Sequence, residues 1–130
     1  MSNKRKIAVI DDDEVFQLII RKQIEMKNID CEMMNFFNGQ EASDFFKSLE
    51  PGSEKTPDLV MLDVNMPVKD GWGFLEDYAQ VSSDVKGKVK LYMVTSSVIQ
   101  SDIDRAESNA DIVGFVSKPL TNDKLEEIFA

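Results

Sequence analysis

The chain lacks histidine altogether, and it holds one cysteine among its 130 residues. Without histidine, catalytic triads that depend on an imidazole and zinc sites with histidine ligands are both excluded. The lone Cys31 can form neither an internal disulfide nor a cysteine cage for a metal, which favours a reducing compartment. We therefore expect a cytoplasmic protein without either kind of site.

Long apolar runs and an excess of positive charge are also missing. The basic start, Met1 to Lys6, is followed by an apolar run of only Ile7 to Ile10, too short for a signal peptide or a membrane span. Fifteen lysines and arginines stand against 24 aspartates and glutamates, a net charge of −9. This charge opposes non-specific binding to nucleic acid or to an anionic membrane, so we expect neither as a direct partner.

What is present fits one globular domain over residues 1–130, since 42% of the residues are hydrophobic and 30% are charged. Short apolar runs predict five strands. These are Ile7–Ile10, Cys31–Phe37 (the weakest of them), Leu59–Leu62, Val89–Val94 and Ile112–Val116.

A helical pattern follows each predicted strand. The apolar positions are those of Val15–Met26, then Ala42, Phe45, Phe46 and Leu49, then Trp72, Leu75, Tyr78 and Ala79, then Ile103, Ala106 and Ala110, and finally Leu125, Ile128 and Phe129. Residues 82–88 are expected to form a loop. Five alternating β-α units predict an α/β fold, a flavodoxin-like doubly wound (βα)5 sandwich with a five-stranded parallel sheet in the order 2-1-3-4-5.

Polar side chains stand at the ends of four of these strands. Asp11 and Asp12 follow the first strand and Asp63 the third, while Thr95 and Lys118 follow the fourth and fifth. In the predicted topology the first and third strands are neighbours, so the three carboxylates should meet at the edge where ligands bind in such folds.

Three carboxylates so close together need positive charge, because two unit charges ~4 Å apart repel by about 4 kcal/mol at an effective dielectric constant of ~20. Lys118 can neutralise one of them. Mg2+ suits the remainder, since it accepts few carboxylates together with waters and a phosphate oxygen. Such a site is suited to phosphoryl transfer, with Asp63 as the nucleophile.

The chain closely resembles the receiver domain of two-component response regulators from Lys6 to about Phe129. The resemblance is carried by four segments, in order and at strand ends: Ile7–Asp13, Pro57–Pro67 with Asp70 and Gly71, Val94–Ser96, and Val116–Pro119. Each segment is weak by itself, but the combination is specific.

The resemblance implies roles for the acidic residues. Asp63 is similar to the aspartate that accepts a phosphoryl group from a sensor histidine kinase or a histidine phosphotransfer protein. Asp12 resembles a direct Mg2+ ligand, and Asp11 a partner that acts largely through water. Asn65 resembles the residue whose backbone carbonyl completes the metal shell.

The resemblance also implies a switch. Lys118 is similar to the lysine that contacts the phosphoryl group, and Thr95 to the hydroxyl residue that moves toward it. Phe115 stands where the family has its switch aromatic, and Ser96 is small, which leaves access to Asp63. The expected protein is a stand-alone receiver without an effector domain. It would catalyse only its own phosphorylation and slow dephosphorylation, and signal to an unknown downstream protein.

Other interpretations remain at this point. Asp11 to Val15 also resembles the first motif of haloacid-dehalogenase-like phosphatases, with Asp11 as the nucleophile, and Glu126 and Glu127 as the only acidic pair available beyond Lys118. A pseudo-receiver that never takes phosphate is a third possibility, which the intact acidic set opposes. Phe115 could also be a plain core residue.

Overall fold

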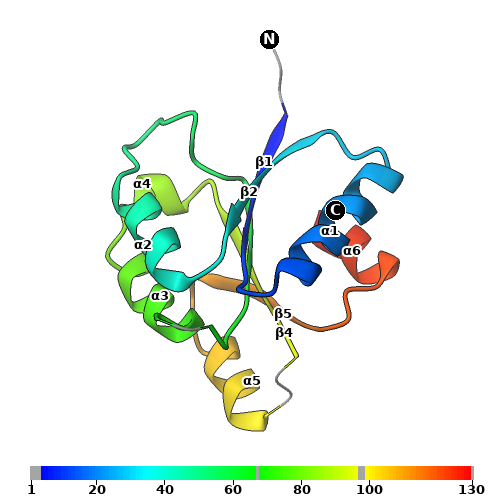
Figure 1. The fold of residues 1–130 in the computed structure, drawn as a ribbon. Coiled ribbons are helices and arrows are strands. Elements are labelled where there is room, and N and C mark those ends of the chain that lie inside the picture. The colour runs from blue at the N-terminus through cyan, green and yellow to red at the C-terminus, as the bar shows by residue number, and fades with distance from the viewer. Residues whose placement is uncertain (1–3, 67, 97–98, 130) are drawn as a thin grey trace.

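Five parallel strands form the centre of the fold, in the order β2-β1-β3-β4-β5 (Figure 1). They are β1 (Arg5–Ile10), β2 (Cys31–Phe36), β3 (Leu59–Leu62), β4 (Lys90–Thr95) and β5 (Ile112–Ser117). The computed structural model describes residues 4–66, 68–96 and 99–129; Pro67, in the second of the four segments that carry the resemblance, lies outside them. The predicted strand order is confirmed.

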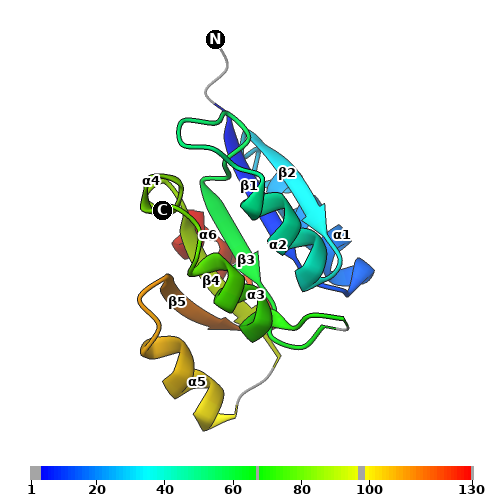
Figure 2. The same ribbon diagram turned by 90° about the vertical axis from the view of Figure 1, so that its left-hand side faces the viewer.

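Helices cover both faces of this sheet. They are α1 (Glu14–Met26), α2 (Gly39–Lys47), α3 (Gly71–Tyr78), α4 (Ser83–Lys86), α5 (Gln100–Glu107) and α6 (Asn122–Phe129). Figures 1 and 2 show α1 and α6 on one side of the sheet and α2, α3 and α4 on the other. Among the described residues, none of these helices is long and apolar enough to cross a membrane.

The alternation of side chains along β1 shows why two cores form. Ile7 and Val9 pack with the apolar faces of α1 and α6, whereas Ala8 and Ile10 pack with residues of α2 and α3. All four are fully buried. Successive residues of a strand point to opposite faces, so a strand buried on both faces must be apolar throughout, as this run is.

The structure corrects two sequence-based expectations. Residues 82–88 are not only a loop, because the one-turn helix α4 lies within them, capped by the Ser82 hydroxyl and anchored by the buried Val85. A single turn is too short to show helical periodicity, so the pattern gave no sign of it. Ala110 lies beyond the end of α5, whose only buried residue is Ala106.

Candidate functional site

Three carboxylates meet at the carboxyl ends of β1 and β3, as the sequence predicts. Asp11 and Asp63 directly follow these neighbouring strands, whose last paired residues are Ile10 and Leu62. One carboxylate oxygen from each of Asp11, Asp12 and Asp63 lies within 4.8 Å of the other two. Asp11 is 1% exposed and Asp63 6%, whereas Asp12 is exposed. The cluster therefore has two buried members and one that faces water.

The third acidic residue of the Asp11–Asp13 run has a separate task. Asp13 caps α1, because its Oδ1 accepts hydrogen bonds from the backbone N–H groups of Val15 at 2.9 Å and Phe16 at 3.2 Å. The N–H of Asp13 in turn donates to Asp11 Oδ1 at 2.9 Å. The start of the helix is thus built by Asp13, which leaves Asp11 and Asp12 for the cluster.

Lys118 reaches the cluster from the end of β5. Its Nζ donates to Asp11 Oδ2 at 2.6 Å and lies 3.8 Å from Asp63 Oδ2. The ammonium also sits over the ring of Phe16, 4.1 Å from the ring centroid. Its side chain is only 16% exposed, so this cation is held in the site, where it pairs mainly with Asp11.

The pKa of Asp11 is raised by its position in this cluster. Burial raises its pKa from 3.8 to about 6; the hydrogen bonds from Lys118 and from the backbone of Asp13 oppose that rise, and the charge of Asp63 adds to it. Asp11 is therefore hard to ionise mainly because it is buried, and the neighbouring Asp63 carboxylate adds to the difficulty. One ammonium does not balance three carboxylates.

Asp63 is fixed by the loop that follows it. Its Oδ1 accepts a hydrogen bond from the N–H of Val64 at 2.9 Å, while its Oδ2 faces Lys118. Gly71 lies so close that a Cβ there would overlap the Asp63 carbonyl oxygen, and its N–H donates to the Val64 carbonyl at 2.8 Å. The Asp70–Gly71 pair is therefore explained by packing: Asp70 caps α3, and Gly71 leaves room for the strand end.

The other predicted residues lie around this cluster at different depths. Thr95, the last residue of β4, is fully buried, and its carbonyl accepts a hydrogen bond from the Lys118 N–H at 2.9 Å. Ser96 and Asn65 are exposed, and Asn65 lies in the loop after β3, two residues beyond Asp63. Phe115 is half-buried on β5 and packs against the core on the α3 and α5 side.

The donor set fits Mg2+. It offers only carboxylate oxygens, and one of the three residues, Asp12, is open to water. Mg2+ prefers such a combination, since it gives up its bound waters reluctantly and takes one or two carboxylates from the protein. A divalent cation would also add positive charge beside the three carboxylates, where Lys118 supplies a single ammonium.

Sequence reasoning missed two residues that shape the site. Phe16 supplies the ring beneath Lys118, and the buried Gln17 donates hydrogen bonds to backbone carbonyls of Val9, Asp11 and Phe36. A signal for Gln17 existed: it lies three and seven residues before Ile20 and Ile24, on the apolar face of α1. A polar residue in such a stripe needs buried partners.

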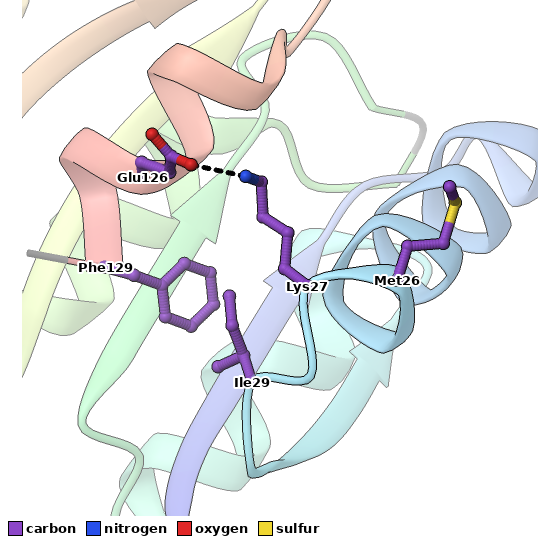
Figure 3. Close-up of a pocket in the computed structure, with 5 residues that line it drawn as sticks. All are labelled: Met26, Lys27, Ile29, Glu126 and Phe129. Atoms are coloured by element: carbon purple, nitrogen blue, oxygen red, sulfur yellow. Dashed lines mark hydrogen bonds and ion pairs between the residues drawn. The ribbon is translucent and has the colours of Figure 1, made fainter.

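A pocket far from the cluster bears on the phosphatase interpretation. It lies between the ends of α1 and α6 and is lined by Met26, Lys27, Ile29, Glu126 and Phe129 (Figure 3). Glu126 points to Lys27 there, with 2.5 Å between Oε1 and Nζ. The 13 residues of α1 separate this pair from Asp11 by about 20 Å at 1.5 Å per residue. Glu126 is therefore not available to complete a phosphatase site around Asp11.

Comparison with known proteins agrees with the geometry. A family model described as the response regulator receiver domain matches residues 7–130. A probable transcriptional regulator, ycf27, of Cyanophora paradoxa is 31% identical over 125 residues, which are 95% of this chain and 46% of that protein. A two-component response regulator from Cytophaga hutchinsonii superposes with a TM-score of 0.86 at 25% identity, covering 98% of this chain and 96% of that one. A response regulator receiver protein from Dyadobacter fermentans gives 0.80 at 26% identity, with 96% and 98% covered.

The chain spans about half the length of the first curated relatives that it matches, 46% and 45% of two ycf27 proteins. In contrast, it covers nearly all of the two solved receiver structures. The similarity to ycf27 therefore concerns just under half the length of those regulators.

Proposed function

The chain belongs to the family of response regulator receiver domains of two-component systems, and we propose that it accepts a phosphoryl group on Asp63. The observation that carries this proposal is the position of the Asp63 carboxylate, which is buried at a strand end beside two further carboxylates and 3.8 Å from the Lys118 ammonium. Phosphoryl transfer needs a held nucleophile and fixed positive charge, and this edge of the sheet has the residues for both.

The two oxygens of Asp63 have different surroundings, which supports Oδ2 as the nucleophile. Oδ1 is held by the Val64 N–H, whereas Oδ2 faces Lys118. Oδ2 attacks the phosphorus of a phosphohistidine, the P–N bond breaks, and its electron pair remains on the imidazole nitrogen, which takes up a proton from solvent. The product is an acyl phosphate on Asp63.

Mg2+ is the proposed cofactor, held by Asp12 and Asp63, by Asp11 largely through water, and by the backbone carbonyl of Asn65. When bound, it balances negative charge on the transferring group. Lys118 supplies the protein's own share of that charge, and its hydrogen bond to Asp11 keeps the ammonium in place beforehand. We propose no turnover of an external substrate, only self-phosphorylation and slow self-dephosphorylation.

Phosphorylation is proposed to act as a switch. A phosphoryl group adds about −1.5 to −2 charge if a side-chain monoester is a fair guide. Lys118 and the Thr95 hydroxyl are drawn toward its oxygens, and Phe115 turns into the space that Thr95 leaves. A pocket of about 200 Å³, lined by Phe115, Ala106 and Ile112 among others, leaves room for repacking. A local change of charge would thereby alter the surface of α5, β5 and α6.

A histidine kinase or histidine phosphotransfer protein is the proposed donor, in the cytoplasm, with an unknown protein as the downstream partner. The face of α1 next to the acidic cluster supports a protein donor, because Val15 is 64% exposed, Leu18 52% and Ile19 49%. Exposed apolar side chains in a group are typical of protein contacts. The net charge of −9 supports the absence of direct contacts with nucleic acid or anionic membranes.

Labelling with acetyl phosphate tests the proposal. The purified protein with Mg2+ should incorporate one phosphoryl group, and Asp63→Asn should abolish it because the nucleophile is lost. Asp58→Asn is the matched control, since Asp58 is an exposed carboxylate at the opposite end of β3 and should not affect labelling. Incorporation by Asp63→Asn at the rate of the unmodified protein would refute the assignment.

A further inference from the structure

Gln17 has an unusual position for a polar side chain. It lies in the first turn of α1, is 4% exposed, and points under the acidic cluster rather than into water. Its Nε2 donates to the carbonyls of Val9 at 3.1 Å, Asp11 at 3.1 Å and Phe36 at 3.0 Å. An amide nitrogen has two hydrogens, so at least one of them is shared between acceptors.

The contacts of Gln17 take the place of backbone hydrogen bonds between β1 and β2 beyond the end of their pairing. The pairing of β1 with β2 ends at Ile10 and Phe36, and the Asp11 N–H still donates to the Phe36 carbonyl at 3.0 Å. No further β2 residue is paired with β1 beyond this point within residues 4–66, so the Asp11 carbonyl takes its hydrogen bond from the Gln17 amide. The side chain extends the hydrogen bonding of the sheet by one residue, at the position of the Asp11 carboxylate.

The amide of Gln17 is itself held in orientation. Asn35 on β2 donates through its Nδ2 to Gln17 Oε1, and the Oδ1 of Asn35 accepts from Arg21 at 3.0 Å. Three carbonyls on one side of the amide and a donor on the other place its nitrogen and oxygen without ambiguity. This chain of contacts runs from the exposed Arg21 to the backbone of Asp11.

Every polar atom of Asp11 takes part in a hydrogen bond. Its N–H donates to Phe36, its carbonyl accepts from Gln17, its Oδ1 accepts from the Asp13 N–H, and its Oδ2 accepts from Lys118. Only Gln17 holds the peptide carbonyl in this set. The direction of the Asp11 side chain depends on the orientation of its backbone, so a free carbonyl would loosen the carboxylate as well.

We propose that Gln17 is a positioning residue that sets the place of the Asp11 carboxylate in the Mg2+ site. This inference rests on the proposed function, which it deepens by assigning a supporting residue outside the cluster. When a residue that orients a metal ligand through a hydrogen bond is removed, the metal affinity typically falls about 10–100-fold.

The test compares two variants of the same helix. Gln17→Met keeps the volume of the side chain and removes its donors, whereas Ile24→Val weakens the core two turns later, where Ile24 is 4% exposed, without touching Asp11. Mg2+ titrations followed by the fluorescence of Trp72, the single tryptophan, should show a Kd about 10–100-fold higher in Gln17→Met. Ile24→Val should keep the original Kd.

A second measurement needs no metal. In the metal-free protein, amide hydrogen exchange at Asp11 and Asp13 should be faster in Gln17→Met and unchanged in Ile24→Val, relative to the global unfolding rate. If Gln17→Met has the same Kd and the same exchange rates as the unmodified protein, the proposal is overturned.

If Gln17→Met does not fold, Asn35→Ala provides the test, because it removes the donor to Gln17 Oε1. A raised Kd for Mg2+ supports the positioning role, and an unchanged Kd overturns it. Absence of both Mg2+ binding and Asp63 labelling in the unmodified protein would refute the proposed function instead, and the exchange rates would still test Gln17.

Discussion

Replacement of Asp11 by asparagine should make the metal-free protein more stable, although it damages the proposed metal site. The buried Asp11 carboxyl has its pKa raised from 3.8 to about 6 in the folded state. A raised pKa means that the folded protein binds the proton more tightly than the unfolded chain does. The stability of the unmodified protein therefore falls as the pH rises from about 4 to 6 and stays low above that range.

The size of the effect follows from the pKa change. A rise from 3.8 to about 6 corresponds to about 3 kcal/mol, at about 1.4 kcal/mol for each pKa unit. Asparagine resembles the protonated acid in shape and cannot ionise, so Asp11→Asn should gain about this much at pH 8 and almost nothing near pH 4. For a domain of this size, the gain corresponds to a melting temperature higher by about 10 °C.

Urea unfolding in EDTA, followed by Trp72 fluorescence, measures this difference across the pH range. Glu25→Gln removes an exposed carboxylate of α1 and controls for the general effect of reducing the net charge of −9. Added Mg2+ should narrow the gap, because the cation stabilises only the ionised Asp11. The reasoning fails if Asp11→Asn is no more stable than the unmodified protein at pH 8, or if the difference does not change with pH.

Two further changes test the cluster and its loop. Mg2+ should increase the free energy of unfolding of the unmodified protein by mass action, by about 3 kcal/mol at a hundredfold excess over Kd, and so raise its melting temperature. Asp12→Ala should remove this gain, and an unchanged melting temperature of the unmodified protein at millimolar Mg2+ would count against the metal site. Val68→Gly should stabilise the protein by about 1 kcal/mol in urea unfolding, because a β-branched side chain is strained at a positive φ. Val68 has φ 69° and is 85% exposed, so little packing is lost, and a lower stability of the variant would contradict this reasoning.

Much of the site could be predicted because parallel strands bring their carboxyl ends to one edge. Once the strands before Asp11, Asp63 and Lys118 were recognised, their convergence followed from the strand order alone. The roles of these residues are still predictions, since the structure shows where they lie and not what they bind. Gln17 was missed because periodicity places a residue on a face of a helix but does not name its partner.

The sequence also could not predict which carboxylate pairs with Lys118. Three carboxylates and one ammonium could be assigned to the same edge, but Lys118 lies 2.6 Å from Asp11 and 3.8 Å from Asp63. Which of the two acids the lysine selects depends on how β5 packs beside β4 and on the ring of Phe16 beneath the ammonium. Such differences of about an ångström arise from packing between segments 107 residues apart.

By itself, the sequence determined the order of the strands and helices, the two-sided burial of the central strands and the polar residues at their ends, because these follow from local apolar patterns and from the rules of parallel sheets. The tertiary structure alone decided the short helix α4, the partner of Lys118 and the hydrogen bonds of Gln17. Each of these depends on contacts between distant segments, whose distances no local pattern contains.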